Sequence, residues 1–136
     1  MDRNRLLGAV SAAQLTTGMA GLAVALTRRH PYDVPMFHGR PERVAQDSVI
    51  MGTALSAPFY MLAAQYLATR RVRQGASGSA DRVLGGLGVA MIAGYLGESL
   101  VRKRLQRSNY DAIETPLVAI AISLSGAMAV LGLIGS

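Results

Sequence analysis

The chain has 136 residues and a formal net charge of +6, from 14 basic and 8 acidic residues. It contains no cysteine, which excludes disulfides, thiolate metal sites and cysteine nucleophiles. Hydrophobic residues make up 51% of the chain, and the charged residues fall in clusters separated by long uncharged stretches. This pattern predicts an all-α integral membrane protein of one domain, because about 20 apolar residues in a helix cross the roughly 30 Å hydrocarbon core of a bilayer.

Four stretches are long and apolar enough to be membrane-spanning helices. The first covers residues 6–27 and the second residues 48–69, and neither contains a charge. The third covers residues 83–101, where Glu98 is the only charged residue, and the fourth covers residues 115–135. We expect these four spans to form a small bundle in a bacterial cytoplasmic (inner) membrane, joined by loops that carry the basic residues.

The loop between the first two spans has an unusual composition. It holds both histidines of the chain and three of its five prolines, and proline fixes φ and favours an extended residue before it. We expect no metal site, because the spacing of His30, Asp33 and His38 matches no standard zinc pattern. The prediction is instead an ordered, basic loop that contacts anionic lipid headgroups or a partner protein. The residues expected to make these contacts are Arg28, Arg29, Tyr32, Phe37, Arg40 and Arg43.

Polar side chains inside the spans are hypotheses for functional sites, because such groups are costly in lipid. The candidates are Gln14, Gln65, Tyr95 and Glu98. A carboxylate at position 98 could carry a proton or a cation, but Arg102 lies four residues later, at the usual spacing of an ion pair on a helix. No histidine or lysine lies in any span, which excludes bis-histidine haem and a retinal Schiff base. We therefore predict no catalytic residue, cofactor or metal in the bundle.

Small residues recur at intervals of four along the third predicted span. Gly86, Ala90 and Gly94 form one such row, and Gly97 follows Ala93 at the same spacing. Faces of this kind let helix backbones approach closely, which favours helix association in lipid. We expect this helix to be either the most buried helix of the bundle or a subunit interface.

The charges do not decide which side of the membrane the termini face. Six basic residues lie on the side of the termini and eight on the other side, which is close to a tie under the positive-inside rule. Either the protein inserts both ways up, or partner subunits and lipids fix its orientation. The basic residues cluster at helix ends, where they meet lipid phosphates, so nucleic acid is not an expected partner.

One proline lies inside the second predicted span. Pro58 predicts a kink there, because proline removes a helix hydrogen bond. Four helices, a long first loop ending in "PERV" and this proline resemble the membrane-associated eicosanoid and glutathione metabolism family. That family also has an Arg, an Asn and a Glu in the turns before its proline, and the matching stretch "AQDSVIMGTALSAP" contains none of them. The chain is therefore not assigned to that family.

Three functional hypotheses remain. The leading one is a non-catalytic accessory, assembly or stabilising subunit of a larger bacterial membrane complex. Its partners would be anionic lipid headgroups and either other membrane subunits or further copies of itself. The second hypothesis is a small homo-oligomeric transporter or channel, and this hypothesis includes a protein that inserts in the membrane both ways up. The third, implied by the resemblance, is a lipid- or glutathione-using membrane enzyme.

Overall fold

The structure is a computed structural model that describes residues 2–28, 33–34, 37–38, 40, 42, 57–75 and 78–134. Apart from one pair of two-residue strands, the regular secondary structure of this part of the chain is helical. Its elements are α1 (Arg3–Arg28), β1 (Asp33–Val34), β2 (Phe37–His38), α3 (Phe59–Arg73), α4 (Ser79–Gly97), α5 (Ser99–Arg104), the 3-10 helix η2 (Arg107–Asn109) and α6 (Glu114–Leu133).

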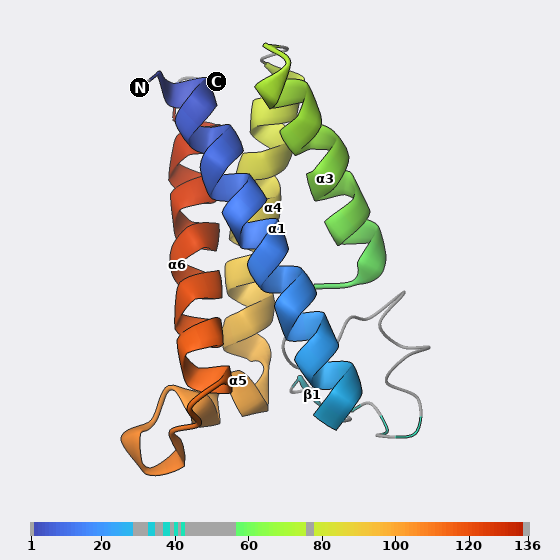
Figure 1. The fold of residues 1–136 in the computed structure, drawn as a ribbon, viewed down its shortest axis with the longest axis vertical. Helices are drawn as coiled ribbons and strands as arrows, with labels where there is room; N and C mark the ends of the chain where they lie inside the picture. The colour runs from blue at the N-terminus through green and yellow to red at the C-terminus, as the bar shows by residue number, and fades with distance from the viewer. Residues whose placement is uncertain are drawn as a thin grey trace.

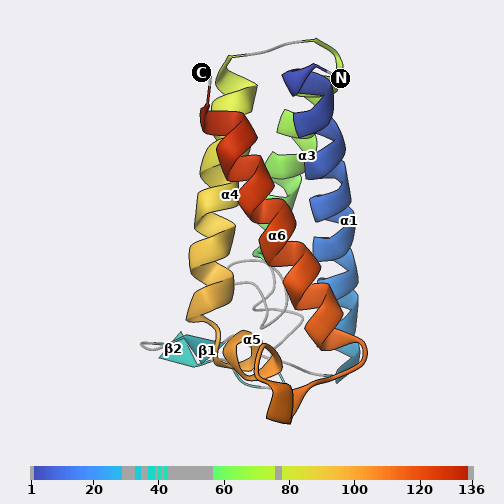
Figure 2. The ribbon, with the colours of Figure 1, turned by 90° about the vertical axis from the view of Figure 1, so that its left-hand side faces the viewer.

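The four long helices form a bundle. α4 packs on α6, α6 on α1, α1 on α3, and α3 on α4, so the contacts close into a ring. Both termini lie at one end of the bundle, where α3 ends and α4 begins, and α5 lies at the opposite end (Figures 1 and 2). We call these the terminal end and the α5 end.

The outer two predicted spans agree closely with the structure. The span expected over residues 6–27 is α1, which begins at Arg3 because the chain stays helical through the charged residues before the apolar run. The span expected over residues 115–135 is α6, which begins at Glu114 and ends at Leu133. Both helices are long and apolar enough to cross a membrane by length and composition.

The inner two predicted spans require correction. Pro58 has an extended backbone (φ −57°, ψ 150°) and α3 begins after it, so no helix runs unbroken through this proline, which has no N–H to donate. Residues 48–56 of that predicted span lie outside the described residues. The third span is also broken, because Glu98 has ψ 129° and separates α4 from α5.

The interior consists of two apolar clusters with polar residues between them. The cluster at the terminal end includes Leu7 and Leu84, and the cluster toward the α5 end includes Met91 and Val118. Five uncharged polar side chains are buried at the level between these clusters, whereas the buried carboxylates of Asp81 and Glu114 lie at the two ends of the bundle.

Glycines allow α4 and α6 to approach closely. A Cβ added at Gly88 would lie 2.6 Å from the backbone oxygen of Ser125, and one at Gly132 would lie 2.5 Å from the backbone nitrogen of Gly85. Backbone atoms cannot move aside as a flexible side chain can, so any larger residue at either position would separate the two helices.

The small-residue row expected on the third span lies on a different face. Gly86, Ala90 and Gly94 are exposed and Gly97 is half-buried. A Cβ added at Gly86 or Gly94 would meet nothing within 4 Å. This row therefore does not pack inside the bundle, and its use as a subunit interface stays a prediction.

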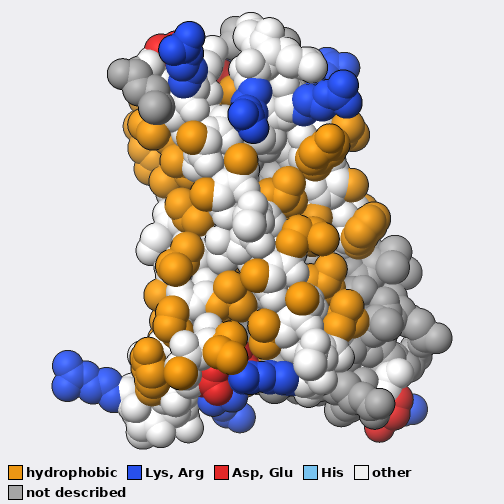
Figure 3. Space-filling model, in the orientation of Figure 1, with side chains coloured by type: hydrophobic (Ala, Val, Ile, Leu, Met, Phe, Trp, Pro, Cys, Tyr) orange, Lys and Arg blue, Asp and Glu red, His pale blue; other side chains and the backbone are white. Residues whose placement is uncertain are grey.

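The surface separates apolar from charged side chains. On the face shown in Figure 3, apolar side chains spread over the middle of the molecule and basic side chains gather toward the two ends. Every long helix contributes a large apolar side chain that is about half exposed: Met19 of α1, Leu67 of α3, Val89 of α4 and Ile120 of α6.

Candidate functional site

Five polar side chains from three helices meet in the interior of the bundle. Gln65 donates from Nε2 to Gln14 Oε1 at 2.7 Å, and Gln14 donates from Nε2 to Ser125 Oγ at 3.2 Å. The hydroxyl oxygens of Ser11 and Thr69 lie 2.6 Å apart and share a hydrogen bond. We call these five residues the polar core: Ser11, Gln14, Gln65, Thr69 and Ser125.

The spacing of these residues along the chain explains why they converge. Ser11 and Gln14 lie three positions apart on α1, and Gln65 and Thr69 lie four apart on α3, so each pair occupies one helix face. All five are buried, and in a region without water polar groups need partners inside the protein. The hydrogen bonds therefore fix the rotation of α1, α3 and α6 about their own axes.

The structure brings two of the predicted intramembrane polar residues together. Gln14 and Gln65 contact each other directly. Tyr95 is also buried, but its hydroxyl makes no hydrogen bond to the described residues, and the same is true of Gln65 Oε1. Ser11 lies three positions from Gln14 and Thr69 four positions from Gln65, so helical spacing could have identified these two residues, whereas Ser125 lies on α6, which carries neither glutamine.

Glu98 is separate from the polar core. It is buried at the break between α4 and α5, and its backbone N–H donates to the carbonyl oxygens of Gly94 and Tyr95. Arg102 donates to the carbonyl oxygens of Leu96 at 3.1 Å and Gly97 at 3.0 Å. Among the described residues no ion pair joins Glu98 to Arg102, because this guanidinium stabilises the end of α4 instead.

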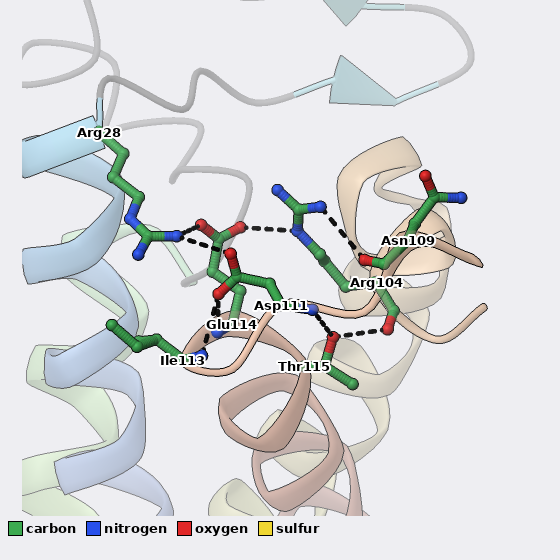
Figure 4. A network of polar contacts seen from close by, with 7 residues as sticks. All are labelled: Arg28, Arg104, Asn109, Asp111, Ile113, Glu114 and Thr115. Carbon is green, nitrogen blue, oxygen red and sulfur yellow. Dashed lines mark hydrogen bonds and ion pairs between the residues drawn. The ribbon is translucent and has the colours of Figure 1, made fainter. Parts of the chain in front are cut away.

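A buried carboxylate holds three elements together at the α5 end (Figure 4). Glu114, the first residue of α6, has a fully buried side chain. Its Oε1 accepts from Arg104 Nε of α5 at 3.0 Å, and its Oε2 accepts from Arg28 Nη1 at the end of α1. A carboxylate between two guanidinium groups makes strong, directional hydrogen bonds. We call this group the Glu114 clamp.

Asp111 supports the Glu114 clamp and begins α6. Its Oδ1 accepts from the backbone N–H groups of Ile113 at 2.9 Å and Glu114 at 2.8 Å, and its Oδ2 accepts from Arg28 at 3.2 Å. These bonds, the one from the Glu114 N–H above all, lower the pKa of Asp111 from 3.8 to about 2. The hydrogen bond to Glu114 is also the main reason that the pKa of Arg28 is raised.

A second arginine joins helices at the terminal end. Arg3 donates from Nη2 to Asp81 Oδ2 of α4 at 2.8 Å, and Asp81 is almost fully buried. The other nitrogen of the same guanidinium, Nη1, donates to the carbonyl oxygens of Leu131 at 2.7 Å and Ile134 at 3.2 Å. Arg3 therefore satisfies carbonyl groups at the C-terminus of α6 that have no partner within the helix. We call this group the Arg3 clamp.

The first loop is described only in part. β1 and β2 pair in antiparallel register, Asp33 with His38 and Val34 with Phe37, so this segment forms a hairpin. Arg28 lies in the Glu114 clamp and Arg40 is exposed. The expected contact residues Arg29, Tyr32 and Arg43 and the side chain of Phe37 lie outside the described residues. In the part that the structure describes, no three acidic or histidine side chains cluster as a metal site would require.

No known protein supplies a function by similarity. No protein family, curated protein or solved structure matches this chain. The functional argument therefore depends on the sequence and on the contacts described above.

Proposed function

We propose that this protein is a four-span subunit of the bacterial cytoplasmic membrane that has no catalytic site of its own. In this proposal it joins a larger membrane complex by packing the outer face of α4 against a transmembrane helix of a partner subunit. The observation that carries the proposal is the exposed row of Gly86, Ala90 and Gly94.

The distribution of charge supports insertion in a membrane. α1 and α6 are long and apolar enough to span, and the middle of the bundle carries apolar side chains on the face of Figure 3. Both arginine clamps lie at ends of the bundle, where the headgroup regions would be. Arginine in such a position meets lipid phosphates and water rather than hydrocarbon.

The two faces of α4 support a role in docking. Its inner glycines, Gly85 and Gly88, pack against the backbone of α6, so this face of α4 is already occupied inside the bundle. The outer row offers the same close approach to a second helix, and Val89 and Leu96 beside it are large, apolar and exposed. In lipid, helices associate through close packing at small residues, because no hydrophobic effect acts between them.

The buried polar residues give less support to a transporter or an enzyme. Gln14 and Gln65, two of the residues that a transport pathway would use beside Glu98, are fully buried and bonded to each other. The hydrogen bond between them joins α1 to α3 without a substrate.

The proposal is tested by purifying the tagged protein from its own membrane in a mild detergent and identifying co-purified proteins by mass spectrometry. Ala90→Leu and Gly94→Leu are expected to reduce recovery of the partner subunit at least about tenfold, because each adds a side chain to the docking face. Ala119→Leu is the matched control, since Ala119 is exposed on α6 and lies away from that face.

Circular dichroism should give the same helix content for the three variants and the original protein. The proposal fails if both α4 variants retain the partner in full. Recovery of the chain alone, or only with copies of itself, would also refute the accessory role, and in the second case it would favour the homo-oligomeric alternative.

A further inference from the structure

A groove runs between α1 and α3 at the terminal end of the bundle. It consists of two adjoining cavities of about 970 Å³ and about 430 Å³. The larger one is lined at the end of the molecule by residues of the first turn of α1 and by the C-terminal residues of α3. The smaller one continues along the two helices, and both cavities share Ala12, Arg73 and Gln74.

The end of the groove is basic and its charge is not neutralised by the protein. Arg73 lines both cavities and Arg70 lines the smaller one, and neither side chain has a hydrogen bond or ion pair among the described residues. Arg5 has one ion pair, a 3.6 Å contact with Asp2 in which both side chains are largely exposed. Such a contact is weak, so three guanidinium groups are available to an anion at this end.

Apolar side chains line the part of the smaller cavity that lies toward the middle of the bundle. Ala12, Leu15 and Tyr66 line it together with Thr16 and Thr69, and Tyr66 lies one turn before Arg70 on α3. The groove thus carries arginines toward its end and a mixed lining with apolar side chains farther along the helix axis. A free phosphate ion would use only the first part, whereas a phospholipid has a chemical group for each.

A glycine positions the arginine that lies where the cavities meet. The side chain of Arg73 crosses the face of Gly8 on α1, where an added Cβ would lie only 2.9 Å from Arg73 Cγ. The stem of Arg73 therefore packs on the backbone of α1, and its side chain lines both cavities.

We propose that this groove is a specific site for an anionic glycerophospholipid. The phosphate is bound by Arg5, Arg70 and Arg73, and one acyl chain lies along Ala12 and Tyr66. This inference rests on the membrane insertion proposed above. The site is at the opposite end of the bundle from the first loop, where the sequence predicts headgroup contacts, and it involves none of those residues.

The site is tested by native mass spectrometry of the protein released from nanodiscs that contain equal amounts of phosphatidylglycerol and phosphatidylcholine. The original protein is expected to retain phosphatidylglycerol in preference to phosphatidylcholine. In the double variant Arg70→Gln with Arg73→Gln, the ratio of retained phosphatidylglycerol to phosphatidylcholine should fall at least about fivefold. The matched control, Arg71→Gln with Arg82→Gln, removes the same charge from exposed residues at the same end that do not line the groove, and should keep it.

The apolar part of the site is tested separately. Ala12→Phe fills the groove where the two cavities meet and leaves every arginine in place, so retention of both lipids should fall. An equal loss of preference in the two double variants would assign the effect to diffuse surface charge and refute the site. Unchanged retention in Ala12→Phe, or full displacement of the lipid by millimolar inorganic phosphate, would refute the binding of an acyl chain.

Extraction of membranes with alkaline carbonate distinguishes failure of the lipid site from failure of the proposed membrane insertion. A protein that stays in the membrane fraction but retains no phosphatidylglycerol refutes the lipid site alone. A protein that is released into the supernatant refutes membrane insertion, and the lipid site with it.

Discussion

Replacing Glu114 by glutamine should measure how strongly the Glu114 clamp holds α1 to α6. The side chain is fully buried, and the substitution removes its charge while keeping its shape. Breaking a buried ion pair by removing one partner costs about 3–5 kcal/mol. Here the side chains of Arg28 and Arg104 are 36% and 24% exposed, and each keeps another acceptor, Asp111 for Arg28 and the carbonyl oxygen of Asn109 for Arg104. The loss of unfolding free energy should therefore lie at or just below the lower end of that range, at about 2–3 kcal/mol.

The assay is reversible unfolding in detergent micelles, followed by circular dichroism as a denaturing detergent is added. Asp2→Asn serves as the control, because the Asp2–Arg5 pair is largely exposed and should contribute less than about 0.5 kcal/mol. Asparagine can still accept the hydrogen bond from the backbone N–H of Arg5, so the start of α1 is kept. If Glu114→Gln were no more destabilising than Asp2→Asn, the clamp would not be what holds these helix ends together.

Two further predictions concern the cap of α6 and the polar core. Asp111 titrates at about 2 in the folded protein against an ordinary 3.8, so its contribution to stability is present above the ordinary pKa and is lost as the pH falls from about 4 to about 2. Asp111→Asn keeps the cap without a titrating charge, so its thermal midpoint should depend less on pH over this range, and equal slopes would contradict the assignment. Gln14→Leu and Gln65→Leu should each destabilise the protein by about 1 kcal/mol, and the double variant by less than their sum, because each single change removes one hydrogen-bond partner of the other buried amide. Strict additivity in that cycle would show that the two amides are not coupled.

The long uncharged runs were enough to predict α1 and α6. A long uncharged run is typical of an apolar helix, and charged residues flank the run in α1 on both sides and the run in α6 at its N-terminal side. The breaks at Pro58 and Glu98 were harder to place. Hydropathy changes little across either position, and the break at Glu98 depends on an arginine that donates to the carbonyl oxygens of Leu96 and Gly97.

The packing faces of α4 were not predictable from composition. Gly85 and Gly88 face α6, whereas Gly86 and Gly94 face outward. One position along a helix is a rotation of about 100°, and small residues occur on both faces, so spacing alone could not select the inner one. Only the contacts with Gly132 and Met128 separate the two faces.

The clamps were missed for a different reason. Arg3 and Asp81 are 78 positions apart, and Arg28 and Glu114 are 86 positions apart. Long side chains that join distant helix ends leave no periodic signal in the sequence. The burial of Glu114 follows from its ion pairs with Arg28 of α1 and Arg104 of α5, and the residues next to it in the sequence do not indicate it.

The two clamps also hold α1 to both ends of α6 and so fix the length of helix between these two attachments. α1 has 26 residues, or about 39 Å of helix, and it is bound to the C-terminal end of α6 through Arg3 and to the N-terminal end of α6 through Arg28. α1 therefore cannot shorten its span by tilting or sliding independently of α6. In a bilayer whose hydrocarbon core is about 30 Å thick, a mismatch with this helix pair would be relieved by tilting of the whole bundle or by a local change in the thickness of the lipid around it.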